Sequence, residues 1–152
     1  MRFLCDEMLV RLARLLRAAG YDTYLASGGQ NDAALLHIAR EEGRLLLTKD
    51  RRLAEAAEPD SVLIAGRGVE AQAQSLSAAV ALDWSCAPFT RCVMDNARLR
   101  PATLDEIDTM PPQAQALPGP FRACPACGRL YWPGSHVRRM SARLGGLASP
   151  GT

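Results

Sequence analysis

Two hydrophobic patterns alternate along the first 84 residues of the chain. Short apolar runs typical of strands occupy residues 2–5, 22–26, 44–48 and 61–65. Apolar residues spaced three or four apart predict helices that begin near Met8 and end at Gly20, run from Asp32 to Gly43, and cover 51–57 and 69–82. Strands that alternate with helices of this length predict an α/β fold with a mainly parallel sheet and helices on both faces.

The pattern ends near residue 84, and the remaining sequence is rich in proline. Its apolar content is too thin for a second conventional core, so something other than hydrophobic burial must organise it. We therefore expect one domain over residues 1–84, a small appendage over 85–145 and a disordered tail over 146–152. The segment 113–117, QAQAL, is expected to be a flexible linker.

Three aspartates follow the first three predicted strands. They are Asp6, Asp32 and Asp50, the last of which ends the segment LLLTKD. Each could simply cap the helix that follows it. However, the carboxyl ends of parallel strands meet at one edge of a sheet, where ligand crevices open, so all three should converge. Gathered carboxylates repel one another unless a cation lies between them.

Oxygen ligands of this kind suit Mg²⁺ or Mn²⁺, so the acids predict attack of a metal-activated water on a phosphodiester. Glu7 could reach the acids or only open the first helix, and Thr48 could hydrogen-bond a carboxylate or a metal-bound water. Lys49 and Arg51 are candidate contacts for substrate phosphates. His37 falls within the apolar stripe of its helix, so we expect it to be packed in the core.

The charge distribution points to a polyanionic partner. Apolar residues make up 48% of the 152 residues and charged residues 22%, which is normal for a globular protein. No apolar run approaches the roughly 18 residues needed to cross a bilayer, and Asp6 and Glu7 interrupt any signal peptide, so a cytoplasmic location is the default. The net charge is only +2, yet five arginines and no acid follow Asp108. Aromatic residues and a histidine are interleaved with these arginines.

Five cysteines in a chain without a secretion signal argue against a disulfide framework. Cys124 and Cys127 form a CPAC pair with the spacing of a zinc knuckle, and Cys92 is a candidate third ligand. The fourth ligand could be Asp95, His136 or Cys86, or the site could hold no metal. Cys5 lies within the first strand and is expected to be a small core residue.

These motifs together resemble a known family. The pattern FLCDEML, the turn Gly20-Tyr21-Asp22 and the stretch DAALLHIAREEGRLLLTKDRRL resemble a PIN-like ribonuclease domain. The segments RCVMDN and CPACGRLYWPGSHVRRM are similar to the zinc ribbon that follows it in the family named for the mutator exonuclease C-terminal domain. The resemblance covers residues 2–143. Asp95 stands where the family pattern has a cysteine, and Arg52 stands where related PIN-like proteins often carry another acid, whose place Glu7 could take.

The resemblance implies a PIN-like fold followed by a zinc-ribbon-like appendage, and cleavage of RNA that depends on Mg²⁺ or Mn²⁺. It implies acidic ligands at Asp6, Asp32 and Asp50 and Zn²⁺ at the cysteines. RNA is the expected partner, and a homodimer is compatible with the family. The residues expected to bind RNA are Lys49, Arg51, Arg129, Tyr131, Trp132, Arg138 and Arg139.

Two other functions fit parts of the sequence. A non-catalytic RNA-binding or protein-interaction module would have the same basic ribbon with a degenerate acidic site. A phosphoacceptor signalling domain would also place acids after the first and third strands, but it usually needs a lysine on a later strand. Lys49 is the only lysine in the sequence, which disfavours the signalling domain.

Overall fold

A parallel four-stranded sheet forms the centre of the N-terminal half. The computed structural model describes residues 1–148. The strands are β1 (Arg2–Cys5), β2 (Asp22–Leu25), β3 (Leu45–Thr48) and β4 (Ser61–Leu63), in the order β2-β1-β3-β4. Leu4 pairs with Tyr24 on one side and with Leu46 on the other. The predicted α/β fold with a parallel sheet is confirmed, although each strand after β1 is shorter than expected.

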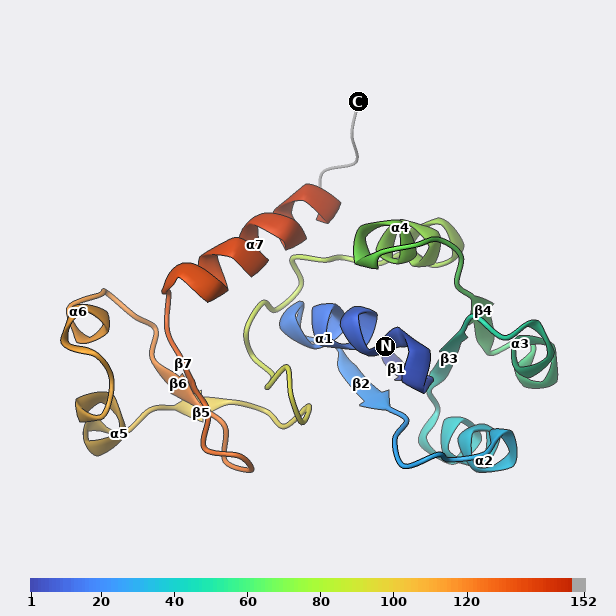
Figure 1. The fold of residues 1–152 in the computed structure, drawn as a ribbon, viewed down its shortest axis with the longest axis horizontal. Helices are drawn as coiled ribbons and strands as arrows, with labels where there is room; N and C mark the ends of the chain where they lie inside the picture. Colours follow the sequence, from blue (N-terminus) through green and yellow to red (C-terminus); the bar gives the residue numbers. More distant parts are fainter. Residues whose placement is uncertain (149–152) are drawn as a thin grey trace.

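Helices cover both faces of this sheet, as the alternating pattern predicted. The chain forms a short 3-10 turn, η1 (Glu7–Leu9), and the helices α1 (Val10–Ala18), α2 (Asp32–Glu42), α3 (Arg51–Ala57) and α4 (Val69–Ala79). Phe3 and Cys5 of β1 pack in one hydrophobic cluster with α1 and α4. Leu4 points to the opposite face and packs with α2 and α3. Figure 1 shows α1 and α4 on one side of the sheet and α2 and α3 on the other.

The C-terminal half has a small antiparallel sheet of its own. Its strands are β5 (Arg100–Pro101), β6 (Arg122–Ala123) and β7 (Leu130–Tyr131), and its helices are α5 (Leu104–Asp108), α6 (Pro112–Gln115) and α7 (Ser135–Ala148). The expected linker 113–117 is partly helical, since α6 extends to Gln115, and Ala114 within it is buried. The expected tail is helical through Ala148, and 149–152 lie outside the described residues.

The C-terminal half packs directly against the core of the N-terminal half. Trp84, Phe89, Tyr131 and Leu144 are buried in the same cluster as α1. Helix α7 lies against α1 and α4 (Figure 1), and Arg143 of α7 pairs with Glu70 of α4 at 2.9 Å. Burial against a surface of α1 therefore helps to organise this segment, in addition to any metal. Within residues 1–148, no helix is long and apolar enough to cross a membrane.

Gly20 fixes the contact between α1 and the segment that enters the C-terminal half. Its φ is +102°, and a Cβ there would lie 2.4 Å from the carbonyl oxygen of Ala87. The neighbouring backbone bonds, from Ala87 N–H to the Ala19 carbonyl and from Phe89 N–H to the Ala18 carbonyl, leave that oxygen little room to move.

We expect Gly20→Ala to lower the free energy of unfolding by about 3 kcal/mol, because it combines backbone strain with a backbone clash. Gly43→Ala is the matched control, since Gly43 has φ +61° but open space around its Cβ position. It should cost only about 1 kcal/mol. Urea unfolding followed by circular dichroism measures both, and equal losses would show that the Ala87 contact carries no weight.

Candidate functional site

Asp6 is held at the carboxyl end of β1 by two hydrogen bonds. Its Oδ1 accepts from the backbone N–H of Met8 at 3.0 Å, which caps η1. Its Oδ2 accepts from the hydroxyl of Thr48, the last residue of the neighbouring strand β3. The backbone N–H of Asp6 also donates to the Leu47 carbonyl at 3.2 Å. Asp6 is only 9% exposed, so this carboxylate is fixed by the sheet.

Thr48 connects Asp6 to the second acid, Asp50. Its hydroxyl oxygen accepts from the backbone N–H of Asp50 at 3.0 Å while the hydroxyl donates to Asp6. The side chain of Asp50 caps α3, with Oδ1 accepting from the N–H groups of Arg52 at 2.9 Å and Leu53 at 3.4 Å. From β1 the chain crosses to β2 on one side of it, and from β2 it crosses back to β3 on the other side. Asp6 and Thr48 thus lie where open parallel sheets form their ligand crevice.

Asp32 lies at the same edge of the sheet, as the first residue of α2. Asn31 caps α2, since its side-chain oxygen accepts from Ala34 N–H at 2.9 Å. Asp32 is therefore not the capping residue, although it lies in the first turn of α2, where a negative charge suits the helix dipole. Glu7 reaches toward the same loop, and its carboxylate accepts from Gly29 N–H at 2.8 Å. Glu7 thereby ties the loop before α2 to the end of β1.

The three aspartates do not form a closed ligand set. Within the described residues, one group of acidic, histidine or cysteine side chains has its ligand atoms within 4.8 Å of one another, and it lies in the C-terminal half. Asp32 and Asp50 are exposed and Asp6 is buried. Mutual repulsion keeps carboxylates apart, so a cation at this edge would have to draw them together. His37 is exposed instead of packed in the core, because Leu35 and Ala39 form the buried side of α2.

Two turns of the same shape build the cluster in the C-terminal half. In the turn Cys124–Gly128, the N–H of Gly128 donates to the Cys124 carbonyl and the N–H of Cys124 donates to the Arg129 carbonyl. In the turn Cys92–Asn96, the N–H of Asn96 donates to the Cys92 carbonyl and the N–H of Cys92 donates to the Ala97 carbonyl. Gly128 and Asn96 both have positive φ, at +77° and +72°. Asp95 therefore occupies in its turn the place that Cys127 occupies in the other.

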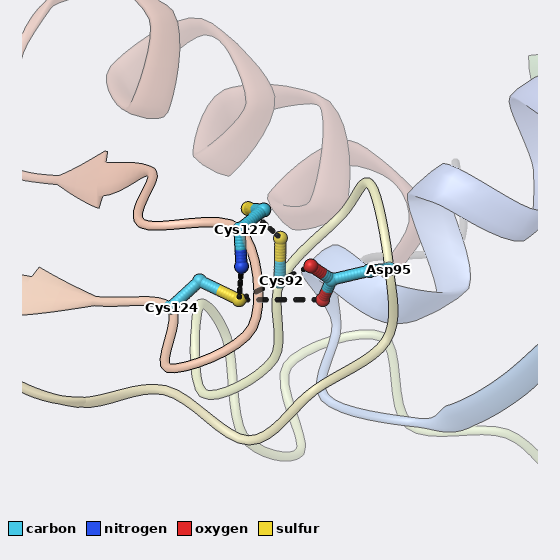
Figure 2. A group of neighbouring side chains, drawn as sticks. All are labelled: Cys92, Asp95, Cys124 and Cys127. Atoms are coloured by element: carbon cyan, nitrogen blue, oxygen red, sulfur yellow. Dashed lines mark hydrogen bonds between the residues drawn. The ribbon is translucent and has the colours of Figure 1, made fainter.

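The side chains of the cluster lie close enough together to share one metal ion. They are Cys92, Asp95, Cys124 and Cys127, whose ligand atoms all lie within 4.8 Å of one another, and Figure 2 shows the four gathered between the two turns. The sulfurs of Cys92 and Cys127 are 3.8 Å apart, and the Cys124 sulfur is 3.3 and 3.2 Å from the two Asp95 oxygens. Zinc bound to sulfur at about 2.3 Å requires sulfur–sulfur separations of about 3.8 Å. The residues thus fit a zinc ion, with Asp95 rather than His136 or Cys86 as the fourth group.

The surroundings of the cluster support binding of a cation. Burial raises the pKa of the Cys124 thiol to about 11, so without a cation this thiol stays protonated and donates to Asp95. Burial opposes ionisation of Asp95, but hydrogen bonds from Ala97 N–H and the cysteine thiols outweigh it and hold its pKa below the usual range. The N–H groups of Ala126 and Cys127 point at the Cys124 sulfur, which favours a thiolate there.

Tyr131 supports this cluster and is not placed to stack on RNA. It is 6% exposed, and its hydroxyl donates to the Cys92 sulfur at 3.2 Å while accepting from Val93 N–H at 3.0 Å. Burial raises the pKa of Tyr131 above its usual range, which keeps this donor protonated. Cys5 is fully buried in the core, as expected, and Cys86 is exposed and lies outside the cluster.

The remaining expected RNA-binding residues lie on the surface. Exposed cationic side chains are Lys49, Arg51, Arg129, Arg138 and Arg139. Trp132 is half-buried between two pockets of about 300 Å³ each, one of which is also lined by Arg129 and His136. The indole lies so close over Gly134 that a Cβ there would be 2.7 Å from its Nε1. Two functional candidates, Arg17 and Asn96, were missed from the sequence, because a helix arginine and a turn asparagine carry no distinctive signal.

Comparison with known proteins gives one family and one relative. A family model described as the Mut7-C RNAse domain matches residues 1–144, which include both the acidic edge and the cysteine cluster. A protein of Homo sapiens named "Exonuclease mut-7 homolog" is 43% identical over 47 residues, or 31% of this chain and 5% of that protein. The chain therefore matches only a small part of that relative's length. No solved structure matches the chain.

Proposed function

Because the chain belongs to the Mut7-C RNase domain family, we propose that it is a metal-dependent ribonuclease whose acidic edge hydrolyses RNA phosphodiesters. The observation that carries this proposal is the hydroxyl of Thr48, which joins the side chain of Asp6 to the backbone of Asp50 at the carboxyl ends of β1 and β3. Two acids from different strands are thus linked at the point where α/β sheets usually bind ligands. The fold in this proposal is PIN-like.

Asp6, Asp32 and Asp50 are the proposed ligands of Mg²⁺ or Mn²⁺. When bound, the cation would polarise a water molecule and stabilise the charge that develops on the phosphate. Asp6 is already oriented by Thr48, so its carboxylate needs the least rearrangement. Asp50 accepts both of its capping bonds at Oδ1, and rotation of an exposed side chain can bring its oxygens toward Asp6. Glu7 holds the loop that precedes Asp32 instead of acting as a fourth ligand.

The C-terminal half is the proposed RNA-binding surface. Arg129, Arg138 and Arg139 are exposed and can neutralise phosphates. Trp132 is the proposed stacking platform for an unpaired base, because it lines both pockets of the ribbon. Lys49 and Arg51 flank Asp50 and would contact phosphates next to the scissile bond.

Zn²⁺ at the cysteine cluster has a structural part in this proposal. Four protein groups with no position left for water are typical of structural zinc, whereas catalytic zinc sites keep one position open. The ion would fix the two turns that carry Cys92 and Cys124. It would thereby hold the C-terminal half, with its exposed arginines Arg129, Arg138 and Arg139, against α1.

A non-catalytic RNA-binding module is the second candidate. It is favoured by one observation, namely that the three aspartates are not gathered as the cysteine cluster is. The basic ribbon serves this function equally well. The two candidates therefore differ in cleavage and not in binding.

One experiment on the purified protein distinguishes the two candidates. Labelled single-stranded RNA is incubated with the protein and Mn²⁺ or Mg²⁺, with excess EDTA in parallel, and both binding and cleavage are measured. The proposal expects RNA binding with cleavage that requires the divalent cation. Binding without cleavage under either cation would select the non-catalytic module, and neither binding nor cleavage would reject both.

A further inference from the structure

The guanidinium of Arg17 is buried between the two halves of the protein. Arg17 lies on α1 and is only 5% exposed. It donates to the carbonyl of Thr23 at 2.9 Å and to the carbonyls of Val93 and Met94 at 3.1 Å each. Val93 and Met94 are the two residues between Cys92 and Asp95. A single side chain of the N-terminal half thus fixes the peptide groups of the turn that carries two metal-ligand candidates.

Arg17 is also a buried charge without a carboxylate beside it. In the part of the chain that the structure describes, no carboxylate oxygen forms an ion pair with it within 4.0 Å. Buried arginines are nearly always paired, because an isolated buried charge is costly. Burial lowers the pKa of Arg17, and the carboxylate of Asp95, which belongs to the cysteine cluster, is among the groups that oppose this shift.

Binding of zinc at the cluster would bring the missing counter-charge, because cysteines coordinate zinc as thiolates. Three thiolates, one carboxylate and Zn²⁺ sum to a net charge of −2. The Arg17 guanidinium would be near that charge, because it binds the Val93 and Met94 carbonyls of the turn that carries Cys92 and Asp95. The buried cation and a loaded cluster would therefore stabilise one another.

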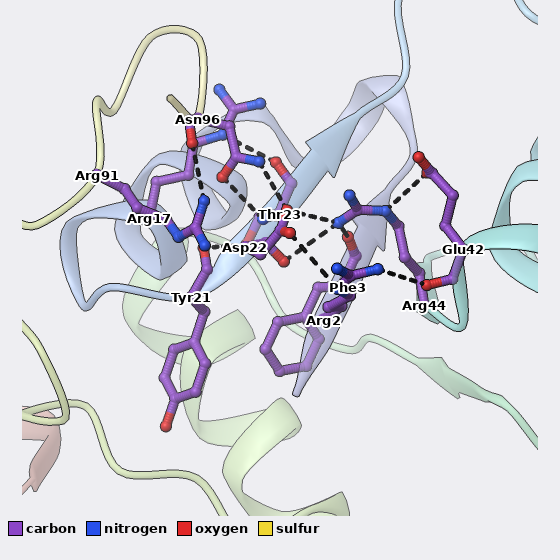
Figure 3. A network of polar contacts seen from close by, with 10 residues as sticks. All are labelled: Arg2, Phe3, Arg17, Tyr21, Asp22, Thr23, Glu42, Arg44, Arg91 and Asn96. Atoms are coloured by element: carbon purple, nitrogen blue, oxygen red, sulfur yellow. Dashed lines mark hydrogen bonds and ion pairs between the residues drawn. The ribbon is translucent and has the colours of Figure 1, made fainter. Parts of the chain in front are cut away.

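Asn96 fastens the other end of the same turn to the sheet. Its side-chain oxygen accepts from Thr23 N–H at 2.9 Å, and its amide donates to Asp22 Oδ1 at 2.7 Å. Thr23 lies on β2, an edge strand of the sheet. Asn96 and Arg17 thus satisfy both outward-facing backbone groups of Thr23, as a further strand would do. Figure 3 shows Arg17 and Asn96 approaching β2 together.

We propose that Arg17 and Asn96 are positioning residues for the metal cluster. Through them, zinc binding is coupled to the hydrogen bonds that cover the backbone N–H and carbonyl of Thr23 at the edge of β2. Side chains that orient metal ligands without touching the metal typically change affinity by about 10- to 100-fold when they are replaced. Coupling also runs in the other direction, because linkage is reciprocal. Removing zinc should therefore loosen the turn and expose the N–H of Thr23.

This inference rests on the proposed binding of zinc, and its test measures zinc binding rather than RNA cleavage. Zinc affinity is determined by competition with a chromophoric chelator for the parent, Arg17→Met and Asn96→Gly. Glycine is chosen at position 96 because it accepts the φ of +72° found there. We expect both variants to bind zinc about 10- to 100-fold more weakly than the parent. Arg14→Met, an exposed position on the same helix, should leave the affinity unchanged.

Hydrogen exchange at the Thr23 amide provides a second readout that a purely structural role would not change. In the parent, this amide should exchange faster after zinc is removed, and in Asn96→Gly it should exchange fast with or without zinc. If Arg17→Met does not fold, Arg17→Lys replaces it, since lysine keeps the charge but cannot reach three carbonyls at once. Parent-like zinc affinity in folded Arg17 and Asn96 variants, or no zinc binding by the parent, would overturn the proposal.

Discussion

Replacing Asp6 by asparagine should reduce cleavage of single-stranded RNA by about 10²- to 10³-fold, as is typical when one charged group that stabilises a transition state is lost. Asparagine keeps one oxygen to cap η1, and its NH2 group can donate to the Thr48 hydroxyl oxygen in place of the bond that the second carboxylate oxygen accepted, so the local structure should survive. Only the negative charge needed by the cation is removed. The rate is measured at saturating Mn²⁺ together with the melting temperature, so that any loss of activity is separated from unfolding.

The same assay applies to two related variants and a control. Asp50→Asn should lose activity to a similar degree, and Thr48→Val should lose about 10- to 100-fold because it only orients a ligand. Asp60→Asn is the matched control, since Asp60 is an exposed aspartate that precedes β4 and thus lies at the opposite edge of the sheet. If Asp6→Asn cleaves as fast as Asp60→Asn, the acidic edge is not the active site.

Loss of the metal at the cysteine cluster should have the largest effect on stability. Structural zinc contributes about 10 kcal/mol or more to the folding of small zinc domains. We therefore expect Cys124→Ser to lose zinc and to melt about 20 °C or more below the parent, given about 2–4 °C for each kcal/mol in a chain of this size. Cys124 is the buried member of the CPAC pair, so a serine there also leaves a polar group without a metal.

Controls at two other positions separate the metal from cysteine chemistry. Cys86→Ser removes an exposed cysteine outside the cluster and should change neither zinc content nor melting temperature. Asp95→Cys should keep one zinc per chain, because Asp95 holds the position equivalent to Cys127. Zinc content is measured by mass spectrometry of the purified protein. Cys124→Ser that retains a full zinc equivalent would contradict the assignment of the cluster.

The elements of the N-terminal half were predictable because each has a strong local signal. The leucines of LLLTKD and the seven-residue helix after Asp50 have the expected boundaries within one residue. In the structure, as in the prediction, Asp6, Asp32 and Asp50 follow the first, second and third strand. The burial of His37 was predicted wrongly. A short apolar stripe does not show whether Leu35 or His37, on either side of Leu36, faces the sheet, and the structure buries Leu35.

The packing of the C-terminal half could not be read from the sequence. Its few large apolar residues, such as Trp84 and Leu144, do not form a second core but extend the first one. Helix α1 is buried at more positions than one face provides, because the sheet covers one side and the C-terminal half covers another. No local pattern specifies such a long-range contact. The choice of Asp95 over His136 and Cys86 as the proposed fourth ligand likewise needed the matching geometry of the two turns.

Binding of a catalytic cation at the acidic edge is the central claim, and anomalous scattering from crystals soaked in Mn²⁺ tests it most directly. We expect an anomalous peak in contact with carboxylate oxygens of Asp6 and Asp50, with Asp32 close enough to join them, and no such peak in Asp6→Asn crystals. A fully soaked parent crystal with no manganese at Asp6 would contradict the account.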